Sequence, residues 1–231
     1  MNVYMIGCGG IGGWLAQNLA KMLGDADSLT LIDKDKIEDH NLDRQLFEPR
    51  AVGSVKCMVL GRTIHARCTT VPKASFLGDE GRGAVTRFDP SSWVFVAADN
   101  HPARRTALRM CDASNSHCVI AANEMTDAEA YYYSPAWQDT GLDPRKYYPE
   151  LLTGTFGDPL SPPCTGDVLQ TAPQLALANM SAANYAMWLW WFWAQVAPTL
   201  KMDEARAVAP VHVTSTAGRL NVRTYAELGG I

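Results

Sequence analysis

The sequence of 231 residues lacks several patterns that mark common protein classes. None of its six cysteines forms a Cys-x-x-Cys pair, which argues against a zinc knuckle and against a disulfide framework. It contains no block of like charges and its formal net charge is only −4, so it shows neither a nucleic-acid footprint nor a basic membrane-binding face. The first residues show no basic region or cleavage site of a signal peptide. We therefore expect a cytoplasmic protein with free thiols and with no nucleic-acid or membrane partner.

The sequence also has no apolar run long enough to span a bilayer. The nearest candidate, residues 186–196, contains four tryptophans but is too short. We expect it to be a helix buried in the core or at a subunit interface. With 47% hydrophobic and 19% charged residues, the chain can form one sizeable core, and we expect a single domain over residues 1–231.

Short apolar runs alternate with helical patterns in the first half of the chain. Such alternation predicts a parallel sheet, and strands this apolar must be covered on both faces. The sequence therefore predicts an α/β fold of the Rossmann-like three-layer type. The expected strands are residues 3–6, 29–32, 93–98 and 118–122, and the expected helices are residues 11–23, 56–66 and a third through 105 and 110.

The second half predicts antiparallel strands that extend this sheet. Residues 130–133 are a further expected strand, whereas residues 134–167 are rich in Pro, Gly and Asp and show no clear period. We expect that segment to be a long crossover loop that faces a partner, because loops of such length are usually functional. A long helix over residues 168–196 follows, and then a hairpin of residues 208–214 and 220–225.

The first functional motif is a glycine-rich turn between the first strand and the first helix. Its glycines are Gly7, Gly9, Gly10 and Gly12, which let the backbone approach a phosphate and aim amide N–H groups at it. Asp33 ends the second strand about 20 residues further on, where its carboxylate can accept hydrogen bonds from ribose hydroxyls. These residues fit NAD and ATP equally, so an NAD-dependent oxidoreductase remains an alternative at this point.

The residues after the second strand separate the two alternatives. An apolar strand is followed by Asp-x-Asp at residues 33–35 and by Asn-Leu-x-Arg-Gln at residues 41–45. That stretch has the internal spacing of a known family, and Val-Gly-Ser-Val-Lys at residues 52–56 and Asp-Asn at residues 99–100 come next in the order of the same family. This pattern resembles the ThiF/MoeB/HesA superfamily, which includes the ubiquitin-activating enzymes, and the resemblance covers residues 1–125.

The resemblance implies ATP-dependent adenylation of the C-terminal carboxylate of a ubiquitin-like or sulfur-carrier protein, with release of pyrophosphate. Negative charge builds on the phosphates during that reaction, and fixed cations stabilise it. The implied catalytic residues are Arg44 and Lys56 as cations and Asp99 as the carboxylate that holds Mg²⁺. The implied nucleotide contacts are the four glycines, Asp33 at the ribose, Asp35, Asn41 and Gln45.

Each of these residues also has a structural interpretation. Arg44 can pair with a neighbouring acid, Lys56 can be a solvated helix start, and Asp99 can be a helix cap. Their joint order after a glycine turn favours the nucleotide site. For Arg104 and Arg105, a family role and a structural ion pair explain the sequence equally well, and neither is included in the predicted site.

Cys164 is a further catalytic candidate. Its setting, Pro-Pro-Cys-Thr, resembles that of the thioester cysteine of ubiquitin-activating enzymes and lies just before a predicted helix, whose N-terminus can lower the pKa of a thiol. An inert, partly buried cysteine is the open alternative. Together with Gln170 and Asn179, this region resembles the ThiF-like members of the cassettes called PRTRC.

Two departures from the family alter the expectations. The four zinc-binding cysteines of many relatives are absent, so no zinc is expected. The sequence begins at the first strand, without the N-terminal helix that in relatives carries an arginine into the partner subunit's site. Relatives usually work as dimers, so we expect a homodimer to which the tryptophan-rich helix contributes. A non-catalytic scaffold subunit of an activating heterodimer is the remaining alternative.

Overall fold

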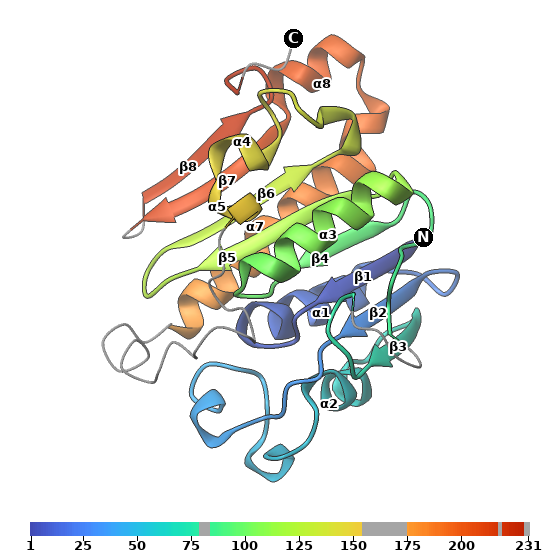
Figure 1. Ribbon diagram of the computed structural model, residues 1–231, viewed down its shortest axis with the longest axis vertical. Helices are drawn as coiled ribbons and strands as arrows, with labels where there is room; N and C mark the ends of the chain where they lie inside the picture. The colour runs from blue at the N-terminus through green and yellow to red at the C-terminus, as the bar shows by residue number, and fades with distance from the viewer. Residues whose placement is uncertain (79–83, 154–174, 217–218, 229–231) are drawn as a thin grey trace.

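The computed structural model describes residues 1–78, 84–153, 175–216 and 219–228, which form an eight-stranded sheet with helices on both faces (Figure 1). The strand order is β3-β2-β1-β4-β5-β6-β7-β8. Neighbouring strands from β3 to β5 are parallel, and those from β5 to β8 are antiparallel. The strands are β1 (Asn2–Ile6), β2 (Ser28–Ile32), β3 (Thr69–Lys73), β4 (Trp93–Val96), β5 (His117–Asn123), β6 (Ala128–Tyr133), β7 (Pro210–Thr216) and β8 (Arg219–Thr224). The predicted α/β fold with an antiparallel extension is confirmed.

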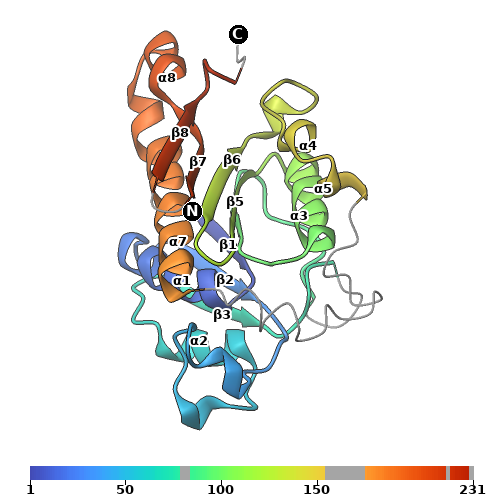
Figure 2. The same ribbon diagram turned by 90° about the vertical axis from the view of Figure 1, so that its left-hand side faces the viewer.

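The helices form two layers. In Figure 2, α1 and α7 lie together on one face of the sheet, and α3, α4 and α5 lie on the other. The helices are α1 (Gly10–Met22), α2 (Lys56–Thr63), α3 (His101–Ser114), α4 (Pro144–Tyr147), α5 (Glu150–Thr153), α7 (Ala176–Trp191) and α8 (Met202–Val208). Single turns are η1 (Asp39–Asn41), η2 (Pro49–Ala51), η3 (Pro135–Trp137) and η5 (Ala197–Thr199), and α7 continues as a π-helical segment, η4 (Phe192–Val196). Among the helices of the described ranges, none has the length and apolar character that a membrane crossing requires.

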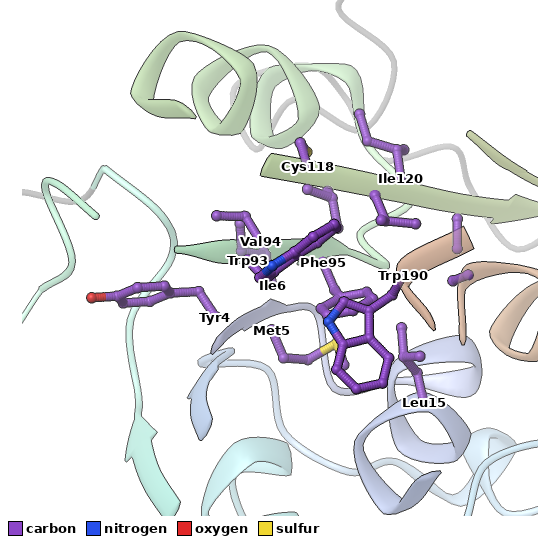
Figure 3. Close-up of a cluster of buried hydrophobic side chains, with 14 of the residues drawn as sticks. Tyr4, Met5, Ile6, Leu15, Trp93, Val94, Phe95, Cys118, Ile120 and Trp190 are labelled. Carbon is purple, nitrogen blue, oxygen red and sulfur yellow. The ribbon is translucent and has the colours of Figure 1, made fainter. Parts of the chain in front are cut away.

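The core lies on both faces of the sheet, and its largest buried side chain, Trp190, lies between the central strands and the layer of α1 and α7. Figure 3 shows the indole of Trp190 on α7 close to Met5, Phe95 and Leu15, and all four side chains are buried. The ring centroids of Phe95 and Trp190 are 6.5 Å apart. Burying each of these side chains contributes about 1.5–3 kcal/mol to stability. The core therefore fixes α7 against the strands whose ends carry the glycine turn.

The tryptophan-rich helix is buried on one side only. Trp190 is buried, but 63% of Trp188 is exposed, and the rings of Trp188 and Trp191 contact each other edge to face on the outer side of α7. The helix thus packs in the core, as expected, and also presents aromatic rings to the outside. The expected start of this helix at residue 168 lies outside the described residues. Within the described residues, α7 begins at Ala176.

Two elements were missed and one was described incorrectly. The sequence pattern predicted neither β3 nor α8. The expected crossover loop contains η3, α4 and α5 in its described part, so residues 134–153 are not irregular. Arg145 and Asp143 fix this segment, because Asp143 caps α4 and its carboxylate accepts hydrogen bonds from the Arg145 side chain at 2.8 and 3.1 Å.

Candidate functional site

A cavity of about 580 Å³ opens at the carboxyl ends of the central parallel strands. Its floor includes the ends of β1 and β4, which are neighbours in the sheet although β2 and β3 come between them in the chain. Ligands of open α/β sheets bind at this switch point, and cavities of about 300–1,000 Å³ accommodate small molecules. A second cavity, of about 30 Å³, lies between β6 and α4 and is too small for such a ligand.

The glycine turn joins β1 to α1 at the edge of this cavity. Gly7 has a φ of +89°, and a Cβ on Gly12 would lie 2.0 Å from the carbonyl oxygen of Gly7. These two glycines are therefore required by the turn itself. Gly7, Gly9 and Gly10 line the cavity, whereas Gly12 does not belong to its lining. The turn thus brings three of the four predicted glycines to the site.

Asp33 lies in the floor and is held by the backbone. One of its carboxylate oxygens accepts the N–H of Cys8 at 2.7 Å, and the other accepts the N–H of Asp35 at 2.8 Å. Burial raises the pKa of Asp33, and the nearby charge of Asp35 adds to the effect. Burial and the Asp33 charge also raise the pKa of the Cys8 thiol well above its usual value. Cys8 is thus a buried, protonated thiol with a packing role.

Arg44 and Lys56 supply the positive charge at one side of the cavity. Arg44 Nη1 donates to the carbonyl oxygen of His40 at 2.6 Å, and Lys56 Nζ lies 3.8 Å from a carboxylate oxygen of Asp35. The Lys56 side chain is 12% exposed, whereas that of Asp35 is 56% exposed. Lys56 is thus shielded by the protein on most sides, and the interpretation as a solvated helix start is wrong.

Two buried polar atoms beside the cavity have no hydrogen-bond partner among the described residues. They are Arg44 Nε and Gln45 Oε1. Buried polar groups are normally paired, and an unpaired one costs about 1–3 kcal/mol. The unpaired donor fits a phosphate oxygen, and the unpaired acceptor fits a hydroxyl or amino group, so the two together fit a ligand that carries both kinds of group. The donor set of the site therefore fits a nucleotide.

Asn41 and Asp99 line the cavity from its two sides. Asn41 is buried, and its Oδ1 accepts the N–H of Glu38 at 3.1 Å, which stabilises η1. Asp99 is exposed and follows β4 after two alanines. It does not cap the next helix, because Asn100 does so by accepting the N–H of Ala103 at 2.8 Å. The Asp99 carboxylate remains available to the cavity.

A metal ion at Asp99 would need ligands from outside the protein. Within the described ranges, no group of three or more His, Cys, Asp or Glu residues comes together as a metal site. Mg²⁺ is commonly held by one or two carboxylates plus the phosphates of a substrate. A single carboxylate beside a cavity that can hold a nucleotide fits that kind of site.

Several lining residues were not predicted from the sequence. Phe76 and Leu77 follow β3, which was itself missed, and Arg104 lines the cavity while its Nε donates to the carbonyl oxygen of Ala98 at 3.1 Å. Asn179 reaches the cavity from α7. The position of Arg104 shortly after Asp99-Asn100 in the sequence was the one signal that could have placed Arg104 in the site. The other unpredicted lining residues include His40, Pro102, Thr106 and Asn123.

Cys164 lies outside the described residues, so its predicted role stays a prediction. The five cysteines within the described ranges are all free and buried. They are Cys8, Cys57, Cys68, Cys111 and Cys118.

Comparison with known proteins gives both a family and a fold. The model of the ThiF family matches residues 1–148. The structure of PaaA superposes with a TM-score of 0.65 at 18% identity, over 97% of this chain and 72% of PaaA. The structure of E. coli MccB with ATP superposes with a TM-score of 0.62 at 21% identity. The structure of MccB with AMPCPP and MccA has a TM-score of 0.62 at 20% identity, and each of the two matches covers 97% of this chain but only 63% of MccB. The chain thus spans less than two thirds of MccB. Comparison with curated proteins gave no match.

Proposed function

The chain belongs to the ThiF family, and on this basis we propose that it adenylates the C-terminal carboxylate of a small carrier protein or peptide with MgATP. The observation that carries the proposal is the single cavity whose lining includes the glycine turn, Arg44, Lys56 and Asp99. A dehydrogenase needs no such set of two cations and a carboxylate around the phosphate end of its nucleotide.

The lining also suggests how the nucleotide lies. Phe76, Leu77 and Pro102 are apolar residues of the lining, whereas Arg44 and Lys56 are cations of the lining. An aromatic base is best accommodated by apolar and aromatic side chains, and phosphates by fixed cations. In the proposed pose, the base therefore lies toward Phe76 and the phosphates lie toward Arg44.

The proposed reaction joins a carboxylate oxygen to the α-phosphorus as the bond to pyrophosphate breaks. Arg44 offers an N–H fork to the phosphate oxygens, and Lys56 acts as a point charge, so both stabilise charge that develops in the transition state. The buried Asp33 orients the ribose. Bound Mg²⁺ would neutralise part of the phosphate charge, with Asp99 as its protein ligand.

The nucleotide and substrate classes have separate support. MccB structures contain ATP in one case and AMPCPP with MccA in another, and their fold is the one described above. We extend to this chain the use of ATP and of a small macromolecular substrate. A ubiquitin-like or sulfur-carrier substrate, a homodimer with Trp188 and Trp191 in its interface, and a cytoplasmic location belong to the same proposal.

Cys164 is proposed to accept the acyl group. Its thiolate would attack the carbonyl carbon of the acyl-adenylate, forming a thioester and releasing AMP. We expect Cys164→Ala to leave ATP–pyrophosphate exchange unchanged, because exchange precedes this step, and to remove a thiol-sensitive adduct on a denaturing gel. Cys68→Ala is the matched control. An adduct that survives in the Cys164→Ala variant would contradict this role.

Nucleotide binding is tested by thermal unfolding with MgATP or NAD. At a concentration 100 times its Kd, a ligand stabilises the folded state by about 2.7 kcal/mol. For a chain of this length, that raises Tm by roughly 5–10 °C. We expect MgATP to give this shift and NAD to give none. Stabilisation by NAD alone would replace the proposal with an oxidoreductase, and a shift with neither nucleotide would favour the scaffold alternative.

A further inference from the structure

Asn179 of α7 is a buried amide at the nucleotide cavity, far in sequence from the other lining residues. It is 1% exposed, and its Nδ2 donates to the main-chain carbonyl oxygen of Arg44 at 3.3 Å. The two residues are 135 positions apart. Burying an amide costs free energy unless its hydrogen bonds are made, and α7 carries no charged residue that could pair with it. The hydrogen bond to Arg44 is thus a specific contact between two segments that are distant in the sequence.

The same amide also occupies the space above the start of α1. A Cβ on Gly10 would lie 2.5 Å from Asn179 Nδ2 and 2.6 Å from its Oδ1. Real Cβ atoms essentially never approach so closely, so a glycine is required at position 10 while Asn179 stays in place. The third glycine of the turn is thus explained by the amide from α7 and not only by access of a phosphate.

Asn179 therefore lies between the glycine turn and the segment that carries Arg44. The side chain of Arg44 is held by the His40 carbonyl within its own turn, whereas its main chain is held by Asn179 from outside that turn. The helix α7 is itself a firm support, because it packs on α1, β5 and β6 and carries the buried Trp190 (Figure 2).

We infer that Asn179 is a positioning residue that fixes the Arg44 guanidinium relative to the glycine turn. Its effect on the substrate is transmitted through Arg44, so it governs binding of the outer phosphates more than binding of the nucleoside. The inference rests on the proposed function, because it assigns the phosphates to Arg44. It also links the nucleotide site to the helix that presents Trp188 to the outside.

The test is a pair of binding measurements on the full chain by titration calorimetry, with MgATP and with AMP. Loss of one hydrogen bond of about 1 kcal/mol corresponds to roughly fivefold in Kd. We expect Asn179→Ala to weaken MgATP binding about five- to tenfold and to leave AMP binding nearly unchanged. In an Arg44→Ala background, Asn179→Ala should have no further effect on MgATP.

Controls separate this role from a general loss of stability. Asn184→Ala changes the same residue type on the exposed side of the same helix and should bind both nucleotides like the wild type. Asn179→Asp keeps the shape but loses the donor, and it replaces Asn179→Ala if that variant does not fold. It should weaken MgATP binding at least as much.

The outcomes distinguish the inference from the proposed function. If the wild-type chain does not bind MgATP, both the proposed function and the inference on Asn179 are overturned. If the wild type binds MgATP and Arg44→Ala weakens it, but neither Asn179 variant does, only the inference is overturned. Equal weakening of MgATP and AMP, or effects of the two substitutions that simply add, would also overturn it, because they would indicate a direct contact or a structural defect.

Discussion

Asp99→Asn is expected to lower the rate of ATP–pyrophosphate exchange by about 100- to 1,000-fold, the usual cost of removing an electrostatic group from a transition state. The substitution keeps the shape of the side chain and removes the negative charge that would hold Mg²⁺. Asp99 is exposed and does not cap α3, so folding should be unaffected. The rate is measured with labelled pyrophosphate and a carrier or peptide that supports exchange by the wild type. The first substrate to try is any small protein with a Gly-Gly end that the neighbouring genes are found to encode.

Asp43→Asn is the matched control for this experiment. Asp43 is also exposed, precedes Arg44 directly and is not part of the cavity lining. It should retain the exchange rate of the wild type, and both variants should keep the wild-type Tm in the absence of nucleotide. Exchange that continues unchanged in Asp99→Asn would remove Asp99 from the reaction and would leave the metal without a protein ligand.

The sequence was most informative where local pattern and tertiary position coincide. The strands β1, β2 and β4 are short apolar runs. Gly7 and Asp33 follow β1 and β2 directly, and Asp99 follows β4 after two alanines. Because the carboxyl ends of parallel strands meet at one edge of the sheet, these residues could be placed together without a structure. The family pattern added Arg44 and Lys56.

The missed strand β3 shows where periodicity fails. It lies at the edge of the sheet, contains Pro72, and has side chains that are only partly buried. Proline is tolerated on an edge strand but is a signal against a strand in sequence analysis. Phe76 and Leu77 were missed for the same reason, since their place in the cavity depends on the strand before them.

Asn179 was missed as a site residue for a different reason. The sequence places it on a long helix, in a region that resembles the PRTRC proteins, but that resemblance assigns no role to the residue. Its contact with Arg44 arises only because α7 packs against α1. In the same way, the pattern placed Asp33 in the site but could not show that both of its carboxylate oxygens accept backbone N–H groups. Contacts between distant segments are the part of a site that local sequence does not encode.

Arg145→Met is expected to lower the free energy of unfolding by about 3–5 kcal/mol, because it leaves the buried carboxylate of Asp143 without its cation. Arg145 donates to Asp143 at 2.8 Å, to Asp112 at 2.8 Å and to the hydroxyl of Tyr133 at 2.7 Å. The Asp143 side chain is only 2% exposed. Although burial opposes its charge, the hydrogen bonds to Asp143 and Asp112 raise the pKa of Arg145, so it stays charged. Methionine fills the space but leaves both carboxylates without their cation, although Asp143 still accepts backbone N–H groups and Asp112 still accepts the Tyr133 hydroxyl.

The free energy is measured by urea unfolding, and Arg109→Met is the control. Arg109 is exposed on α3, the helix that carries Asp112, and its loss should change stability by less than about 0.5 kcal/mol. In the Arg145→Met background, Asp143→Asn should recover part of the loss because it removes the stranded charge, although Asp143 also caps α4. A loss below about 1 kcal/mol would mean that water solvates this cluster, and residues 134–153 would then be held mainly by their aromatic contacts with β6.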